Sequence, residues 1–293
     1  MGAARTNRDE HRAHLPPTAR RSAVTVGQLQ RTFELLGVRP GGVLVAHASL
    51  AKLGFVLHGV EGLRLALERT LGPAGTLVVS TFTGDRSDPA CWVDPALPSS
   101  MWNELRDGMP AFHKHKSLPR QMGRLALSIL MDRDAQRSDH PLCSFAAVGP
   151  RAAELTQGHD LCDPFGPASP IGRARAMGGQ VLLLGIDQRR NSAIAHAQCC
   201  ADVPQVHRRK GAFLSEVDGE RRWITPKRMA ECGEGFPKIE DHFVVRGLVR
   251  VERVGDGNAR LMDLGPFCSA VEYHLRLYPE AVACGRDACR QCG

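Results

Sequence analysis

A chain of 293 residues, of which 43% are hydrophobic, can bury a sizeable core, and no apolar run approaches the roughly 18 residues of a membrane-spanning helix. The N-terminal arginines are not followed by the apolar segment of a signal peptide, so we expect a cytoplasmic protein with no membrane partner. The formal net charge of +7 comes partly from residues 1–22, and the sequence has no aromatic-interleaved basic stripe, so we expect no nucleic-acid partner.

Composition divides the chain into a leader, one domain and a tail. Residues 1–22 are polar, interrupted by prolines and without hydrophobic periodicity, which predicts a disordered leader. We expect a single domain over residues 23–283, with a β-rich subregion at about 205–265. A cysteine-bearing tail, residues 284–293, follows the domain.

The domain begins with two units that each place a helix before a buried strand. Residues 25–37 open on a threonine cap, carry apolar residues at helical spacing and end on a glycine. The β-branched run 43–47 then predicts a core strand. Residues 60–71 and 76–80 repeat this order. Two such units predict an α/β fold around a mixed or parallel sheet.

The middle of the chain holds a long irregular stretch and the clearest core strand. Residues 81–118 contain four prolines and no period, and loops of this length are usually functional. A helix over 122–131 and a strand over 145–149 are expected next. The apolar run 180–185 predicts a core strand, and its loop leads into a helix that begins near Asn191.

After Pro204 the pattern changes to alternation and turns. Residues 212–224 predict a hairpin with an Asp-Gly turn. A second strand pair is expected from Val244–Val251 and Ala259–Leu264. A last helix at about 266–278 precedes the tail.

Several polar residues stand where an open α/β sheet would place a ligand. Residues 47–52 follow a predicted core strand, and amides and hydroxyls at such a turn could hold a phosphate, a pantetheine amide or a thioester carbonyl. The alternative is an ordinary strand-to-loop junction with its lysine in solvent. The candidates for binding a cofactor are His47, Ala48, Ser49, Leu50, Lys52, Thr81 and Ser169.

Two of the neighbouring motifs also have plain structural readings. Ser169 precedes Pro170, so it could be no more than a helix N-cap, although the same helix N-terminus would also receive an anionic or carbonyl group. Residues 137–144 gather a cation, hydroxyls and an imidazole before a strand. A structural turn accounts for that group equally well.

His196 lies early in the helix that follows the 180–185 strand, where a base near neutral pH would be useful. A structural role is the alternative for a single helical histidine. Cys199 and Cys200 lie three and four residues further on, so one of them could share its face and act as a nucleophile. Two adjacent cysteines in an apolar helix are more often core residues.

The ten cysteines are too few for a disulfide-dense scaffold of this length. Three of them form a cluster at the C-terminal end, and tetrahedral zinc needs four nitrogen or sulfur ligands. A structural zinc site is therefore one hypothesis, and a tail with free thiols is the other. The candidate ligands are Cys232, Cys284, Cys289 and Cys292.

These segments, taken in order, resemble the antibiotic N-acetyltransferase (aminoglycoside 3-N-acetyltransferase) family. The similarity is carried by VRPGGVLVAHAS at 38–49, LGPAGTLVVSTF at 71–82, RSDHP at 137–141, ASP at 168–170 and GQVLLLG at 179–185. It implies an α/β/α sandwich around a central mixed sheet, distinct from the GNAT fold. It also implies antibiotic resistance through acetyl-CoA and the 3-amino group of a 2-deoxystreptamine aminoglycoside, in a monomer or homodimer.

The resemblance further implies direct transfer, with a histidine polarised by a carboxylate as general base. We assign these roles to His196 and Glu231. The sequence departs from the family pattern here, because the ungapped register puts Ala195 at the histidine position and Gln198 at a glutamate position. One residue is about 100° of helix.

Two other functions remain open. A polycationic antibiotic needs an acidic cleft, which the basic charge balance does not indicate, so a biosynthetic acyltransferase that uses a CoA or carrier-protein thioester on another amine is one alternative. The displaced histidine suggests the other, a catalytically silent CoA-binding homologue. Acidic residues in the long loop could still supply such a cleft, namely Asp85, Asp88, Asp94 and Glu104.

Overall fold

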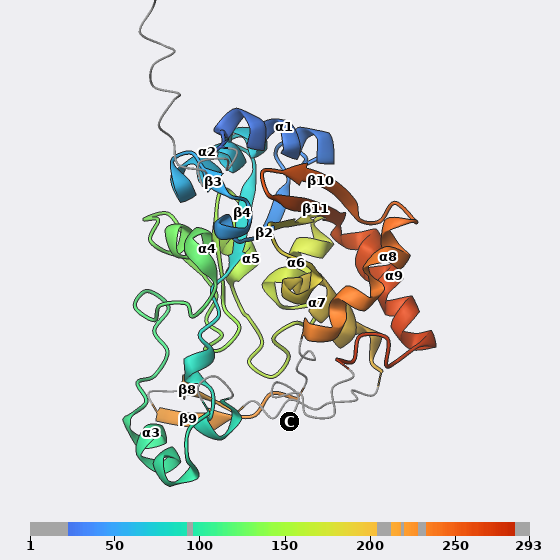
Figure 1. The fold of residues 1–293 in the computed structure, drawn as a ribbon. Helices are drawn as coiled ribbons and strands as arrows, with labels where there is room; N and C mark the ends of the chain where they lie inside the picture. The colour runs from blue at the N-terminus through green and yellow to red at the C-terminus, as the bar shows by residue number, and fades with distance from the viewer. Residues whose placement is uncertain (1–22, 93–95, 204–211, 218–219, 228–232, 285–293) are drawn as a thin grey trace, which may run out of the picture.

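A computed structural model describes residues 23–92, 96–203, 212–217, 220–227 and 233–284 (Figure 1). The predicted leader, residues 1–22, and residues 285–293 of the predicted tail lie outside the described residues. Within the described part of the chain, no helix is long and apolar enough to cross a membrane.

A seven-stranded mixed sheet forms the centre, in the order β10-β11-β7-β2-β4-β6-β5. Strands β7, β2 and β4 are parallel, and each outer neighbour pairs antiparallel to them. The strands are β1 Ala23–Val24, β2 Val43–Ala48, β3 Phe55–Val56, β4 Thr76–Ser80, β5 Gln136–Arg137, β6 Phe145–Val148, β7 Gln180–Leu184, β8 Phe213–Val217, β9 Glu220–Ile224, β10 Arg250–Val254 and β11 Gly257–Asp263.

Helices cover both faces of the sheet, which makes three layers (Figure 1). The helices α1, α2 and α4 pack on one face, and α5, α6, α7 and α9 pack on the other. The α-helices are α1 Val26–Leu36, α2 Gly59–Leu71, α3 Trp102–Gly108, α4 Gly123–Leu130, α5 Ala152–Thr156, α6 Pro170–Ala176, α7 Ser192–Ala201, α8 Glu240–Val244 and α9 Leu264–Leu277.

The two cores follow from alternation along the buried strands. Successive residues of a strand point to opposite faces. In β2, Val43 and Val45 therefore belong to the core under α5 to α9, while Leu44 and Ala46 belong to the core under α1, α2 and α4. A run that is apolar at every position is what a strand covered on both faces requires.

Local signals set the first helix as predicted. The Thr25 side chain accepts from the Gln28 backbone N–H, and the Gln28 side chain accepts from the Thr25 N–H, which makes a capping box. Gly37 ends the helix at φ 84°, a left-handed conformation that glycine adopts without strain. The predicted strands at 43–47, 76–80, 145–149 and 180–185 are likewise present within a residue or two of their expected ends.

The structure corrects one predicted strand and adds elements that the sequence did not indicate. Residues 244–249 were expected in a strand, but Val244 ends the short helix α8 and a turn at Gly247 precedes β10. The loop 81–118 contains the helix α3. The hairpin β8–β9 forms a sheet of its own, and Figure 1 shows it beside α3 at the bottom of the molecule. The predicted Asp218-Gly219 turn lies outside the described residues.

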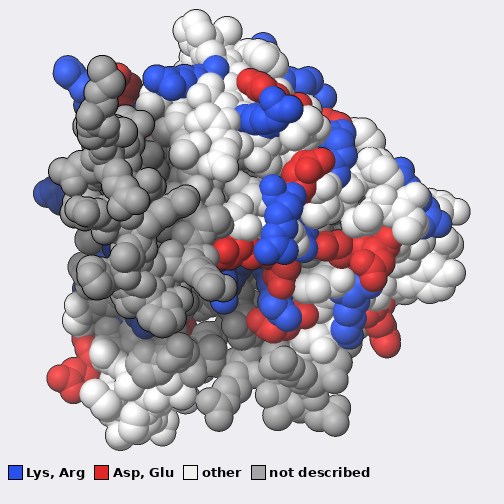
Figure 2. All heavy atoms as spheres, turned by 45° about the horizontal axis from the view of Figure 1, so that its top comes forward, with Lys and Arg blue, Asp and Glu red and all other residues white. Residues whose placement is uncertain are grey.

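Charged side chains of both signs are interspersed on the face drawn in Figure 2. Among the ion pairs of the described residues, Asp263 contacts two guanidinium groups, those of Arg39 at 2.7 Å and Arg250 at 2.9 Å.

Candidate active site

Three polar side chains meet at the edge of the sheet where β2, β4 and β7 end. His47 is the penultimate residue of β2, Ser80 is the last residue of β4, and Ser192 is the first residue of α7, which follows β7. Nε2 of His47 lies 2.9 Å from Ser192 Oγ, and its Nδ1 lies 3.5 Å from Ser80 Oγ. A histidine between two hydroxyls therefore stands where open α/β sheets bind their ligands.

The His47 ring is held neutral at physiological pH. It is half-buried, while both serines are almost fully buried. Burial lowers the pKa of His47 to about 4, because the surrounding protein removes hydration from the charged ring. One ring nitrogen therefore keeps its lone pair at pH 7, and because each hydroxyl can donate or accept, both tautomers suit these partners.

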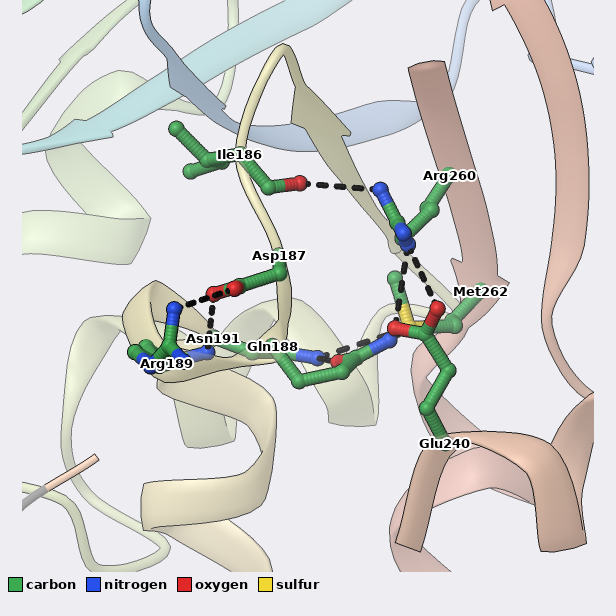
Figure 3. Close-up of polar contacts among 8 residues, drawn as sticks. All are labelled: Ile186, Asp187, Gln188, Arg189, Asn191, Glu240, Arg260 and Met262. Atoms are coloured by element: carbon green, nitrogen blue, oxygen red, sulfur yellow. Dashed lines mark hydrogen bonds and ion pairs between the residues drawn. The ribbon is translucent and has the colours of Figure 1, made fainter. Parts of the chain in front are cut away.

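Figure 3 shows the loop, residues 186–191, that carries the chain from β7 into α7. Asn191 caps the helix, since its Oδ1 accepts from the Ala193 N–H at 2.9 Å. Its Nδ2 donates to Gln188 Oε1 at 2.7 Å and lies 3.4 Å from Met262 Sδ. These contacts are buried, so the first turn of α7, including Ser192, is held from inside the protein.

An ion pair between two other elements holds the start of the same loop (Figure 3). Arg260 of β11 donates through Nε to both carboxylate oxygens of Glu240 in α8, at 2.9 and 3.0 Å, and through Nη1 to the Ile186 carbonyl at 3.1 Å. Both charged side chains are largely buried. On the outer side, Arg189 pairs with Asp187 at 2.7 Å.

The turn 47–52, which we predicted to bind a cofactor, is present, and the exposure of its residues differs along its length. Ala48, Ser49 and Leu50 are half-buried, and Lys52 is exposed at the end of a 3-10 helix over Leu50–Lys52. The Ser49 N–H already donates to the Leu184 carbonyl at 2.9 Å, so that amide is committed to the backbone. The side chains of Ser49 and Lys52 remain accessible to a ligand.

Thr81 and Ser169 are fully buried, and their hydroxyls bind inside the protein. Ser169 Oγ accepts from the Gly172 N–H at 3.2 Å and donates to the Gly166 carbonyl, so it caps α6 as its sequence context allowed. The oxygens of Thr81 accept from the buried Arg137 guanidinium, at 3.1 Å for Oγ1 and 2.7 Å for the carbonyl. Neither hydroxyl faces solvent.

Most side chains of the motif at 137–144 are buried and hydrogen-bonded within the protein, whereas Asp139 is exposed. Ser138 Oγ lies 2.9 Å from His159 Nδ1, and His159 Nε2 lies 2.9 Å from the Pro164 carbonyl, which requires the proton on Nε2. His140 Nδ1 accepts from two backbone amides of its own turn. Burial is the main cause that lowers the pKa of His140 to about 3 and that of His159 to about 4. The sequence did not single out His159, which comes from a separate loop.

His196 lies in α7 as predicted, four residues or one turn beyond Ser192, and it is 2% exposed. Its Nδ1 is 2.6 Å from the Phe165 carbonyl, which places the proton on Nδ1. Its Nε2 is 3.3 Å from Arg175, whose guanidinium also pairs with Glu272. Burial, and then the Arg175 charge, lower the pKa of His196. Its predicted partner Glu231 lies outside the described residues.

The two adjacent cysteines differ in their surroundings. Cys200 Sγ lies 3.7 Å from both ring nitrogens of His196, whereas Cys199 is buried. Equal distances to the two nitrogens do not align the sulfur with the Nε2 lone pair. Of the pair, Cys200 is the neighbour of His196.

The predicted zinc ligands are mostly outside the described residues. Cys232, Cys289 and Cys292 lie there, and Cys284 is half-buried at the end of the described chain. In the portion that the structure describes, no group of three or more histidine, cysteine, aspartate or glutamate side chains could hold a metal ion. The described residues therefore give the zinc hypothesis no support.

A sequence model for the family described as Aminoglycoside 3-N-acetyltransferase matches residues 45–276. Aminoglycoside N(3)-acetyltransferase VIII of Streptomyces fradiae is 36% identical over 219 residues, which cover 73% of this chain and 74% of that protein.

Solved structures share the fold. The YokD protein from Bacillus subtilis superimposes with a TM-score of 0.81 at 25% identity, over 88% of this chain and 96% of that one. The binary complex of AAC-IIIb with CoASH gives a TM-score of 0.72 at 23% identity, over 88% and 97% of the two chains.

Proposed function

Because the chain belongs to the aminoglycoside 3-N-acetyltransferase family and is therefore an acyltransferase, we propose that it moves an acetyl group from acetyl-CoA to the 3-amino group of a 2-deoxystreptamine aminoglycoside. The family membership and the α/β/α sandwich with a central mixed sheet are as the sequence resemblance implied. In a bacterial cell this reaction would confer antibiotic resistance.

The family match over residues 45–276 carries the proposal. It spans all three residues that meet at the sheet edge, namely His47, Ser80 and Ser192. A thioester donor suits this edge, because an acyl transfer needs polar groups around a carbonyl and a group that can take a proton.

Acetyl-CoA is the proposed donor substrate, and the turn 47–52 is its proposed binding segment. The half-buried His47 to Leu50 and the exposed Lys52 can contact a ligand directly, and the lysine charge suits a phosphate. Thr81 and Ser169 are buried, so in this proposal they fix the walls of the site. The coenzyme A complex of AAC-IIIb shows that the same fold holds this molecule.

The acceptor amine is proposed to enter from the long loop 81–118. Asp88 there is neutralised by Arg106 at 2.8 Å. Asp85 differs, because among the described residues its buried Oδ1 has no hydrogen-bond partner. We assign Asp85 to an ammonium group of the acceptor. Asp94 lies outside the described residues.

Direct transfer requires that the attacking nitrogen lose a proton while the CoA thiolate leaves. From the sequence, we assign His196 as the base that takes this proton and Glu231 as the carboxylate that orients it. In the structure the Nε2 lone pair of His196 faces Arg175, so this base can work only if the guanidinium withdraws toward Glu272. His196→Ala would then lower turnover by roughly a hundredfold or more.

The test is thiol release from acetyl-CoA across a panel of aminoglycosides, with mass spectrometry of the products. We expect a gain of one acetyl group at the 3-amino position. His196→Ala is measured in the same assay, and wild-type turnover in that variant would remove His196 from the mechanism.

A catalytically silent CoA-binding homologue is the second candidate. One observation favours it: both ring nitrogens of His196 already have protein partners and the side chain is buried. Coenzyme A binding without transfer to any amine would support this candidate over the enzyme.

A further inference from the structure

The pair at the sheet edge offers a proton acceptor that the sequence resemblance did not assign. His47 Nε2 and Ser192 Oγ are 2.9 Å apart, a hydrogen bond between residues 145 positions apart in the chain. We propose that His47, acting through the Ser192 hydroxyl, is the general base of the transfer reaction. This inference rests on the proposed function and replaces His196 in that single role.

The hydrogen-bond partners of the two histidines distinguish them. The Phe165 carbonyl fixes the proton of His196 on Nδ1, and a guanidinium 3.3 Å from Nε2 opposes an added proton there. Burial lowers the pKa of both rings, that of His47 to about 4, and what distinguishes His47 is that its described partners, Ser80 from β4 and Ser192 from α7, are uncharged. A ring between two hydroxyls can receive a proton on one nitrogen while the other donates.

The protein holds Ser192 in place for this role. It begins α7, whose Asn191 cap is fixed by Gln188 and Met262, and the loop before it is held by Arg260 (Figure 3). The hydroxyl is buried and lies within hydrogen-bond distance of His47, which is itself half-buried at the edge where β2, β4 and β7 end. Preorganised groups of this kind cost no reorganisation during the reaction.

The proposed step balances as follows. The acceptor nitrogen attacks the thioester carbonyl and forms the C–N bond, its proton passes to Ser192 Oγ, and the Ser192 proton passes to His47 Nε2. The tetrahedral adduct then breaks its C–S bond, and the CoA thiolate takes the proton from His47. Because the buried imidazolium holds a proton weakly, it is a strong acid toward a thiolate.

The experiment compares kcat/KM for His47→Gln and Ser192→Ala from pH 6 to 9.5, with acetyl-CoA and the aminoglycosides that wild type accepts. We expect roughly a hundredfold loss or more for His47→Gln at pH 7 and a smaller loss for Ser192→Ala. The loss must shrink toward high pH, because a deprotonated amine and hydroxide then do the work of the base. Ser128→Ala, whose hydroxyl donates to the Leu125 carbonyl of its own helix, is the matched serine control and should match wild type.

A pH-independent loss would show a merely structural role for His47 and overturn the inference, and so would full activity in His47→Gln. Imidazole added to His47→Ala should restore part of the rate, and circular dichroism melting checks that each variant is folded. A larger loss at pH 7 in His196→Gln than in His47→Gln would return the role to His196.

The proposed function can fail separately. Wild-type protein that acetylates no aminoglycoside but hydrolyses acetyl-CoA, or acetylates another amine, contradicts the proposed acceptor, and the His47 comparison then proceeds on that reaction. If the wild-type protein does not turn over acetyl-CoA with any acceptor, not even water, both the proposed function and the inference about His47 are overturned.

Discussion

Arg137 offers a quantitative test of how the long loop is held against the sheet. Its guanidinium is 5% exposed and donates to five oxygens: Oγ1 and O of Thr81, Oγ of Ser144, and the carbonyls of Lys114 and Ser117. Burial lowers the pKa of Arg137 to about 10, a cost to the charged form of about 3 kcal/mol. Five bonds from a charged donor at about 1.5 kcal/mol each exceed that cost.

Arg137→Met removes the donor from all five oxygens: the Thr81 carbonyl keeps the Ser144 hydroxyl at 2.8 Å, but the buried Ser117 carbonyl loses its guanidinium. The difference between the two terms predicts a loss of about 4 kcal/mol in the free energy of unfolding. Urea unfolding followed by circular dichroism measures it, and hydrogen exchange at residues 112–117 should accelerate with it, because two of the five acceptors, the carbonyls of Lys114 and Ser117, lie in this segment.

The control for this prediction is Arg173→Met. Arg173 also donates to backbone carbonyls, those of Glu154, Gln157 and Gly158, but at the surface where water replaces it. Arg173→Met should lower the free energy of unfolding by less than about 1 kcal/mol. If Arg137→Met is as stable as Arg173→Met, the assumption that the five lost hydrogen bonds outweigh the cost of burying the charge is refuted.

Two further predictions concern pH and the helix cap. The pKa values of His47, His140 and His159 are lowered to about 4, 3 and 4, so below pH 6.5 the unfolded chain binds protons that the native state does not. The contribution of these histidines to the free energy of unfolding is therefore fully present above pH 6.5. It falls as the pH drops toward 4, by on the order of 3 kcal/mol from pH 7 to 5.5. Equal urea midpoints at these two pH values would contradict this prediction. Asn191→Ala should lower unfolding free energy by about 1 to 2 kcal/mol and reduce turnover, because the cap of α7 is lost. Urea unfolding and the thiol-release assay measure the two effects.

Much of the fold could be predicted because its signals are local. The capping box at Thr25, the glycine at 37 and the continuous apolar runs of β2, β4 and β7 each specify an element within a few residues. Strand direction was not predictable in the same way. The strand at 145–148 pairs antiparallel to β4, since a short apolar run has no signal for its orientation.

The candidate site was predicted in part. His47 was placed correctly at the end of a core strand, because strand ends can be read from the apolar run. Its partners Ser80 and Ser192 were not predicted, although Ser80 ends one predicted core strand and Ser192 follows the loop after another. For His196, the helix was predictable but its contacts were not, because Phe165 and Arg175 come from the separate segments before and within α6.

The sequence by itself determined the family and the alternation of helices with buried strands, and it located the sheet edge that we propose as the site, since these depend on motifs and periods within short windows. Only the tertiary structure decided which side chains meet at that edge. His47 contacts Ser80 across 33 residues and Ser192 across 145, and such contacts depend on the order and register of strands in the sheet. Strand order is fixed by the packing of all the layers together, so no local pattern contains it.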